Sequence, residues 1–268
     1  MKIGLIAGGG QFPILFSEKA RKNGYHVVAA AFKAETDTLL SDHVDELKWF
    51  YLGQLSKLIR YFRQHEVSRA VLLGSIRKTN IFTNIRPDLK ALAFIAKNKK
   101  NHDDSILTAF ADMLGKEGIE ILPSTFLLPE LISPEGCWTK RKPNKAENED
   151  ITEGWRIAKE IGKLDIGQCL VISNGTVLAV EAVEGTDATI LRGGQISSKK
   201  GCVVIKLSKP NQDLRFDLPS SGLQTIQVMK EAGANCLVLE AGKSLAFDRE
   251  EMIAFADKHN IAILARNY

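Results

Sequence analysis

Short apolar runs alternate with segments of helical periodicity through about the first half of the chain. This alternation is typical of a parallel sheet whose strands are joined by helices. Connections of this length favour right-handed strand–helix–strand units. Strands are expected over residues 2–7, 26–31, 46–51, 69–74 and 119–122, and helices over residues 13–23, 54–65, 89–97 and 104–116.

The pattern changes after residue 138. Residues 139–150 read TKRKPNKAENED, a stretch with seven charges and one proline that predicts a linker outside any core. Beyond it, Asn174-Gly175 separates two apolar runs, which predicts a hairpin because both residues of such a turn need a positive φ. Helices are expected over residues 153–161, 222–232 and 249–258, the last with a capping box of Asp248 and Glu251, and strands over residues 202–207, 236–240 and 261–265.

The sequence therefore predicts an α/β protein of two domains. Residues 1–138 form an N-terminal Rossmann-like domain with a parallel sheet. Residues 139–150 are the linker, and residues 151–268 form a smaller C-terminal domain with a mixed α/β fold. The main candidate catalytic motifs lie in the C-terminal domain.

Composition places the chain among globular proteins. Hydrophobic residues make up 44% and charged residues 25% of the 268 positions, which excludes a mainly disordered chain. The net charge of +4 is too small and too scattered to indicate nucleic-acid binding. No apolar stretch reaches the roughly 20 residues that cross a bilayer, and the N-terminus lacks the features of a signal peptide. We expect a cytoplasmic protein whose contact with a membrane is at most peripheral.

Cysteines and histidines give no sign of a metal site or a disulfide framework. The four cysteines lie far apart and form no CxxC pair, and the five histidines stand in unrelated contexts without the spacing of metal ligands. Reduced and buried thiols are expected at Cys137, Cys169, Cys202 and Cys236.

A glycine loop follows the first expected strand. Gly8, Gly9, Gly10 and Gln11 come directly before a helix, so their backbone N–H groups and the helix dipole are placed to hold a phosphate. The loop is not a dinucleotide fingerprint, because the third glycine of that pattern would fall at Pro13. A tight turn that allows close packing explains the glycines equally well.

Two cations follow the fourth expected strand. Arg77 and Lys78 come directly after Gly74-Ser75-Ile76, at the end of a strand where ligands of open α/β sheets gather. They are therefore candidates for contact with a phosphate. Ordinary solvated surface charges are the alternative.

Two loops of the second half are dense in acids and cations. Residues 181–187 read EAVEGTD and residues 206–219 read KLSKPNQDLRFDLP, and each loop follows an expected strand. Carboxylates beside lysine and arginine are the groups that a magnesium-bound phosphate ester needs. Loop acids that accept hydrogen bonds from backbone N–H groups are the alternative.

Four motifs carry a resemblance that covers nearly the whole chain. They are AGGGQFP at residues 7–13, LDIGQ at 164–168, AVEAVEGTD at 179–187 and KPNQDLRFDLPSSGLQT at 209–225. With them the chain resembles the LpxI-type family of UDP-2,3-diacylglucosamine pyrophosphatases of lipid A biosynthesis. The chain departs from the family pattern at Asn211, where glycine is expected, and at Gly193-Gly194, where more charge is usual.

The resemblance implies an activity and a set of site residues. The activity is hydrolysis of UDP-2,3-diacylglucosamine to UMP and 2,3-diacylglucosamine 1-phosphate, with water attacking the α-phosphorus and Mg²⁺ or another divalent cation as cofactor. The implied catalytic residues are Asp217, as metal ligand or base, together with Asp213, Arg215 and Lys209. The implied metal ligands are Asp217, Asp187 and Glu184, and the implied substrate-binding residues are Gly8, Gly9, Gly10, Gln11, Arg77, Lys78 and Thr186.

The partner implied by the resemblance is a lipid-linked UDP-sugar. We also expect a homodimer, formed through the smaller domain, and contact with the inner face of the inner membrane, but no nucleic acid. Two other functions stay open at this point: a nucleotide- or lipid-binding regulatory protein without turnover, and a nucleotide-sugar transferase.

Overall fold

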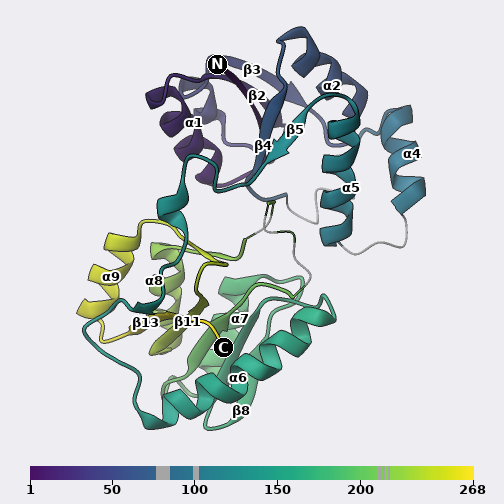
Figure 1. Cartoon of the computed structure of the whole chain (residues 1–268). Helices are drawn as coiled ribbons and strands as arrows, with labels where there is room; N and C mark the ends of the chain where they lie inside the picture. The colour runs from purple at the N-terminus through teal and green to yellow at the C-terminus, as the bar shows by residue number, and fades with distance from the viewer. Residues whose placement is uncertain (77–84, 99–102, 211–212, 214, 217) are drawn as a thin grey trace. The chain divides into compact units, whose positions relative to one another are not determined.

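The computed structural model describes residues 1–76, 85–98, 103–210, 213, 215–216 and 218–268. The chain divides into two compact units. Unit 1 is Met1–Pro129 with Asp213–Asp217, and unit 2 is Glu130–Gln212 with Leu218–Tyr268. Each unit has its own central sheet (Figure 1).

The sheet of unit 1 is wholly parallel, as the sequence predicts. Its strands are β1 (Lys2–Ala7), β2 (His26–Phe32), β3 (Glu46–Phe50), β4 (Arg69–Leu73) and β5 (Glu120–Leu122), in the order β3-β2-β1-β4-β5. The runs Ile3–Ala7 and Val27–Phe32 are buried throughout, which matches a sheet covered on both faces. The strand order reverses between β1 and β4, and this is where open α/β sheets bind their ligands.

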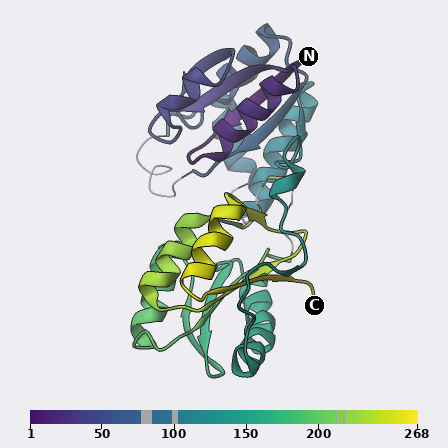
Figure 2. The same ribbon diagram turned by 90° about the vertical axis from the view of Figure 1, so that its left-hand side faces the viewer.

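Helices cover both faces of this sheet (Figures 1 and 2). The helix α1 (Phe12–Lys22) and the short 3₁₀ helix η1 (Thr38–Asp42) lie on one face, and α2 (Leu55–Gln64) and α5 (Asp103–Lys116) lie on the other. Phe62 of α2 and Leu114 of α5 are fully buried in the core beneath them. The helix α4 (Leu89–Asn98) packs on α2 from outside.

The sheet of unit 2 is mixed. Its strands are β6 (Gly136–Cys137), β13 (Ala262–Arg266), β11 (Cys236–Glu240), β9 (Val203–Lys206), β7 (Cys169–Ser173) and β8 (Thr176–Val180), in that order across the sheet. The central strands β9, β11 and β13 are parallel, whereas β6 and β7 run antiparallel to their neighbours β13 and β9. Two short strands, β10 (Ser220–Ser221) and β12 (Leu245–Ala246), pair in parallel outside this sheet.

One long helix covers one face of this sheet, and three shorter helices cover the other (Figure 1). The long helix is α6 (Lys145–Lys163), which buries Ile151 and Trp155 against the strands. The opposite face is covered by α7 (Thr186–Ile196), α8 (Leu223–Ala232) and α9 (Arg249–Lys258), with Ile190, Ile226 and Met252 in the core. Both clusters bury their apolar groups within unit 2.

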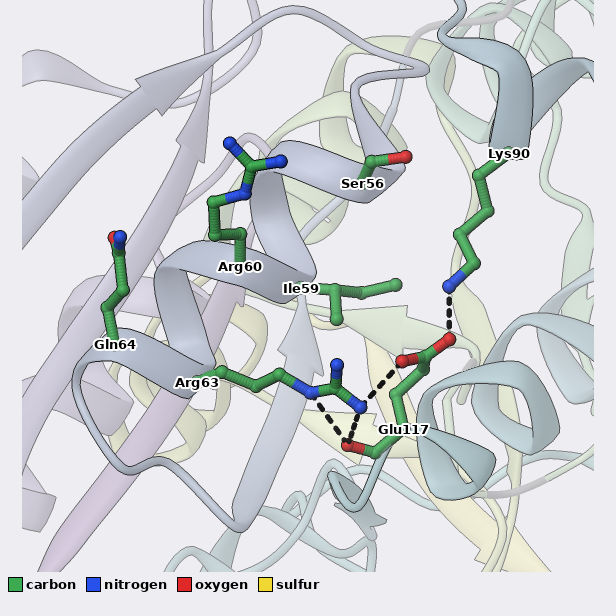
Figure 3. Close-up of a pocket in the computed structure, with 7 residues that line it drawn as sticks. All are labelled: Ser56, Ile59, Arg60, Arg63, Gln64, Lys90 and Glu117. Atoms are coloured by element: carbon green, nitrogen blue, oxygen red, sulfur yellow. Dashed lines mark hydrogen bonds and ion pairs between the residues drawn. The ribbon is translucent and has the colours of Figure 1, made fainter.

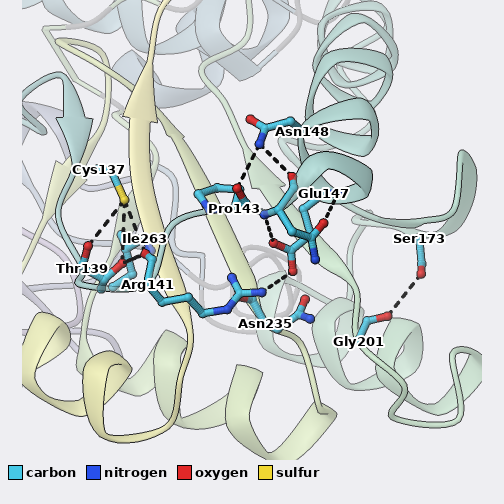
Figure 4. A network of polar contacts seen from close by, with 11 residues as sticks. Cys137, Thr139, Arg141, Pro143, Glu147, Asn148, Ser173, Gly201, Asn235 and Ile263 are labelled. Carbon is cyan, nitrogen blue, oxygen red and sulfur yellow. Dashed lines mark hydrogen bonds and ion pairs between the residues drawn. The ribbon is translucent and has the colours of Figure 1, made fainter.

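Charged residues that the sequence assigns to a linker are part of the packed structure of unit 2. The helix α6 already begins at Lys145, eight residues before the expected start, because Asn144 and Glu147 form a capping box. Glu147 is buried and also accepts a hydrogen bond of 2.5 Å from Arg141, which in turn donates to the backbone carbonyl of Asn235 (Figure 4). Arg141 and Glu147 therefore satisfy each other's charge, and this possibility is not visible in the composition of the segment.

The expected hairpin is present, and a buried acid of the same segment holds it. Asn174 and Gly175 both have positive φ, as the turn requires. Their backbone N–H groups donate to the carboxylate of Asp150, at 3.0 and 2.6 Å. Asp150 is buried in α6, so it fixes this turn against the helix.

The structure corrects three further expectations. No helix was predicted over the residues of α7, which include Gly193 and Gly194. Both glycines are needed there, since a Cβ atom would meet Val171 at the first and Ala232 at the second. Cys137 is exposed, since it lies on the short edge strand β6, whereas the other three cysteines are buried; all four are free thiols. Asp248 has a φ of 49° and its side chain does not cap α9, so the expected capping box is wrong.

Candidate active site

The glycine loop at the switch point of unit 1 packs against the loop that follows β4. The backbone N–H of Gly8 donates to the carbonyl of Leu73, and that of Gly9 to the carbonyl of Ser75, each at 2.8 Å. A Cβ atom at Gly8 would meet the carbonyl oxygen of Ser75 at 2.6 Å. Close packing therefore explains Gly8 and Gly9, and their N–H groups are engaged within the protein.

The last two residues of this loop, Gly10 and Gln11, are exposed. Gly10 has a φ of 89° and no atom within 4 Å of the place where a Cβ would stand. Gln11 is the exposed N-cap residue of α1, and its side chain makes no capping hydrogen bond. A ligand at the switch point would meet Gly10 and the start of α1. Arg77 and Lys78, predicted for the neighbouring loop, lie outside the described residues.

Two cations flank an aromatic ring at the same edge of unit 1, and sequence reasoning missed them. Tyr51 directly follows β3, and its ring centroid lies 4.7 Å from Lys33 Nζ and 3.8 Å from the guanidinium carbon of Arg86. Lys33 follows β2, so the pair marks the carboxyl ends of two parallel strands. A half-buried ring with two cations suits an anionic or aromatic ligand. Nothing in the spacing of these residues along the chain points to this contact.

The motif at residues 209–225 contributes a short segment to unit 1. Phe216 is buried in the core of that unit, and the carbonyl of Arg215 accepts a hydrogen bond from the backbone N–H of Ser124 at 2.7 Å. Asp213 accepts a hydrogen bond from the Thr108 hydroxyl at 3.2 Å. The segment is therefore anchored by its own side chains and backbone to the fold of unit 1.

Within this segment the structure brings Asp213 and Arg215 together. The guanidinium Nη2 of Arg215 donates to Asp213 at 2.7 Å and its Nε at 3.0 Å. The hydrogen bond from Arg215 holds the pKa of Asp213 below its usual range. Asp213 is thus an ionised partner that orients Arg215. Asp217, the strongest catalytic candidate, lies outside the described residues.

Lys209 is placed by an acid from another of the sequence motifs. Its Nζ lies 2.5 Å from the carboxylate of Asp165, and both side chains are largely buried. In the same region a Cβ at Gly167 would collide with the carbonyl oxygen of Glu181, so LDIGQ and AVEAVEGTD pack backbone to backbone. The backbone N–H of Leu207 donates to the carbonyl of Gln168 at 3.0 Å. Three of the four motifs therefore converge in unit 2.

The acids of residues 181–187 serve local structure. Glu181 is buried and accepts a hydrogen bond from the hydroxyl of Thr186 at 2.8 Å. Glu184 accepts from Arg192 at 2.7 Å. Its own backbone N–H and then Arg192 hold the pKa of Glu184 below its usual range. Asp187 is exposed in the first turn of α7, where its charge favours the helix dipole.

The described residues do not form a ready metal site. No group of three or more His, Cys, Asp or Glu side chains that could hold a metal ion is found among them. Glu184 is paired with Arg192, and Asp213 is paired with Arg215. Of the three implied metal ligands, Glu184 and Asp187 are among the described residues and Asp217 is not, so the divalent cation stays a prediction.

Family models match both halves of the chain. The LpxI N-terminal domain matches residues 2–131, and the LpxI C-terminal domain matches residues 134–264. The UDP-2,3-diacylglucosamine pyrophosphatase LpxI of Caulobacter vibrioides is 32% identical over 273 aligned residues, which cover 98% of this chain and 96% of that protein. The chain belongs to the LpxI family. The resemblance that the sequence motifs carry is confirmed.

Solved structures are less similar to this LpxI-family chain. Precorrin-6A reductase CobK aligns with 99% of this chain and 87% of its own, at 8% identity and a TM-score of 0.35. Glycinamide-RNase-transformylase T from Mycobacterium tuberculosis aligns with 68% of this chain and 44% of its own, at 12% identity and a TM-score of 0.28. Neither likeness carries an argument about function.

A buried acid in the LpxI C-terminal domain organises two lysines that the sequence reasoning missed. Glu240, at the carboxyl end of β11, accepts hydrogen bonds from Lys159 at 2.6 Å, from Lys243 at 3.1 Å and from the Ser208 hydroxyl at 2.7 Å. Burial alone raises the pKa of Glu240, but the hydrogen bonds from Lys159 and Ser208 outweigh it, so the pKa lies below its ordinary value. Two cations around one carboxylate leave a positive charge at this sheet edge.

Proposed function

We propose that this protein hydrolyses the pyrophosphate bond of UDP-2,3-diacylglucosamine and releases UMP and 2,3-diacylglucosamine 1-phosphate. The match to the Caulobacter vibrioides pyrophosphatase, over 98% of this chain, is the observation that supports the proposal most strongly. The matched motifs also meet in the fold, since residues 164–168, 179–187 and Lys209 lie together in unit 2. An anionic pyrophosphate suits a region that gathers paired lysines and arginines.

In the proposed reaction the oxygen of a water molecule forms a bond to the α-phosphorus. The bond between that phosphorus and the bridging oxygen breaks, and the bridging oxygen leaves with the sugar phosphate. The water oxygen stays on UMP, and a base accepts the proton that water gives up. We assign the orientation of this water to Asp217, and the neutralisation of phosphate charge to Arg215 and Lys209.

The paired acids have positioning roles in this proposal. Asp213 holds the guanidinium of Arg215, and Asp165 holds the ammonium of Lys209. Fixing a long cationic side chain costs conformational entropy. A carboxylate that already holds the cation in the free protein reduces the entropy cost of binding the phosphates. Dependence on Mg²⁺ or another divalent cation is part of the proposal and rests on the family resemblance alone.

The reaction can be tested by following oxygen. In water labelled with ¹⁸O, the proposal expects one labelled oxygen in UMP and none in the sugar phosphate. Label in the sugar phosphate would place the attack on the β-phosphorus and overturn this route. UDP-N-acetylglucosamine, which lacks the acyl chains, should be a poor substrate, because remote binding energy positions the reacting phosphate.

We also propose a cytoplasmic protein, homodimeric through unit 2, that meets its lipid-linked substrate at the inner face of the inner membrane. Among the residues that the structure describes, no helix is long and apolar enough to cross a bilayer. A diacylated substrate resides in a membrane, so an enzyme that acts on it needs a peripheral contact. Sedimentation velocity of the purified chain tests the dimer.

A further inference from the structure

The residue that precedes Lys209 is held at each of its polar groups. Ser208 follows β9 and is 3% exposed. Its backbone N–H and its hydroxyl both donate to Oε2 of Glu240, at 3.1 and 2.7 Å. Its backbone carbonyl accepts a hydrogen bond of 3.0 Å from Nζ of Lys159. Two side chains from other elements, β11 and α6, therefore fix the place where the chain leaves β9.

Glu240 is itself fixed in one orientation. It ends β11, which pairs in parallel with β9, so the acid lies beside the end of the neighbouring strand. Its side chain is 4% exposed; Lys159 lies 2.6 Å from one carboxylate oxygen, and Lys243 lies 3.1 Å from the other. The backbone carbonyl of Glu240 accepts a hydrogen bond from the Ser244 hydroxyl at 2.7 Å. Ser208 is thus bound to an acid that cannot easily turn.

The helix α6 supports the same segment from a second direction. Lys159 stands one turn before Gly162, and a Cβ atom at Gly162 would lie 3.4 Å from the Cα atom of Lys209. The backbone of Lys209 therefore lies close against the helix. Just beyond the end of α6, Asp165 binds the ammonium of Lys209 at 2.5 Å. Lys209 is held at its preceding residue, at its backbone and at its charged end.

A buried carboxylate with two cations is better suited to fixing geometry than to stabilising a fold. Taking these charges out of water offsets much of their attraction, so apolar side chains of similar size often stabilise a protein as well. Apolar side chains cannot make directed hydrogen bonds, whereas Glu240 makes two of them to Ser208. Phosphoryl transfer depends on such fixed geometry, because its catalysis is mainly positioning and neutralisation of charge.

We propose that Glu240 is a positioning residue for the hydrolysis: it fixes Ser208, and Ser208 holds the backbone of Lys209 so that the ammonium meets a phosphate of the substrate. The inference rests on the proposed function, in which Lys209 neutralises phosphate charge. Glu240 itself touches no substrate atom, and Lys159 supports it by holding the carbonyl of Ser208. Without Glu240, the backbone at Lys209 gains freedom, and fixing it again costs entropy when the phosphate binds and reacts.

The test is a double-mutant cycle between Glu240 and Lys209 in the full chain. Glu240→Gln removes the charge at constant size and should lower kcat/KM for UMP release from UDP-2,3-diacylglucosamine by about tenfold. Lys209→Ala should lower it by about 10²-fold. Because Glu240 acts through Lys209, the double variant should match Lys209→Ala within about twofold. A purely structural acid would instead cause the same loss in both backgrounds.

Binding of UDP, measured by calorimetry, gives the same cycle without turnover. Glu240→Gln should weaken UDP binding about threefold, but should have no effect on it in the Lys209→Ala background. Ser208→Ala is a second variant that removes one hydrogen bond to Glu240 and leaves every charge in place. It should lower kcat/KM by about threefold, again only when Lys209 is present, so the cycle can be completed even with a poorly folded Glu240→Gln. A circular dichroism melt checks the fold of each variant.

Glu117 of unit 1 supplies a matched control, since it also shares its carboxylate between two cations. Arg63 lies 2.7 Å from this carboxylate, and Lys90 contacts it as well (Figure 3). These side chains line a hollow whose lining contains no residue of the four sequence motifs. Glu117→Gln removes one shared charge, as Glu240→Gln does. It should leave kcat/KM and UDP affinity at the wild-type values.

Two outcomes would overturn the inference. One is a folded Glu240→Gln protein with wild-type kcat/KM and UDP affinity, and the other is an equal loss in the wild-type and Lys209→Ala backgrounds. A wild type that shows the cycle in UDP binding but releases no UMP would support the positioning of Lys209 and contradict the proposed hydrolysis. The failure of one proposal is therefore distinct from the failure of the other.

Discussion

The substitution Asp213→Ala tests whether Asp213 positions Arg215 or takes part directly in the reaction. The substitution removes the acceptor of the hydrogen bonds from Arg215 and of one from Thr108. A hydrogen bond to a charged group contributes about 1.5–3 kcal/mol, but the Arg215 side chain is 44% exposed, so solvent screening reduces the value for the pair to about 1.5 kcal/mol. For a unit of this size the melting temperature of unit 1 should fall by about 5 °C.

The kcat of the same variant tests the role of Asp213 in the proposed reaction. Freed Arg215 should neutralise phosphate charge less well, so Asp213→Ala is expected to lower kcat by about 10²-fold. Asp217→Ala, the matched comparison, should lower kcat by about 10³-fold or more with an unchanged melting temperature. The assay is UMP release and thermal melting on the same preparations. An Asp213→Ala enzyme with wild-type stability and a loss as large as that of Asp217→Ala would refute the positioning role.

The pH dependence of stability follows from the same contact. The pKa of Asp213 is lowered in the folded state, so its ion pair stabilises the fold at any pH above its ordinary value of 3.8. The contribution is lost as the pH falls below that value and the carboxylate becomes protonated. Acid unfolding of wild type and Asp213→Ala should therefore converge at low pH.

Three other predictions concern groups that the fold holds in place. Asp150→Ala leaves two N–H groups of the hairpin turn without their acceptor and should cost about 2–3 kcal/mol in denaturant unfolding. Asp88→Ala removes the caps at Ser56 and Ala91 and should cost about 2 kcal/mol, whereas Asp88→Asn should lose less. Burial raises the pKa of Tyr61 from 10.0 to about 12, so the fold should lose stability as the pH rises through this range, and Tyr61→Phe should remove that loss in an alkaline melt.

The parallel half of the fold could be predicted because its signals are local. The buried runs of β1 and β2 and the apolar period of α2 agree with the sheet and helices that form. The turn at Asn174-Gly175 was also predictable, since the requirement for positive φ is a property of two residues. The start of α6 was not, because Arg141 and Glu147 are recognisable as packed residues only when their partners are known.

The site was predictable in its motifs but not in its contacts. The sequence placed Asp213, Arg215 and Lys209 in one motif, yet it could not tell that Asp213 pairs with Arg215 and joins unit 1 while Lys209 pairs with Asp165. Long-range pairs of this kind leave no period or spacing in the chain. For the same reason, the sequence does not reveal the two lysines around Glu240 or the two cations beside Tyr51.

The central claim is tested most directly by incubating the purified protein with UDP-2,3-diacylglucosamine, with and without EDTA. We predict equal amounts of UMP and 2,3-diacylglucosamine 1-phosphate without EDTA, little product with EDTA, and recovery on addition of Mg²⁺. Asp217→Ala, purified in the same way, controls for a contaminating hydrolase and should release almost no UMP. Binding of the intact substrate by the folded wild-type protein with no UMP release would contradict the account and indicate a protein that binds this lipid without turnover.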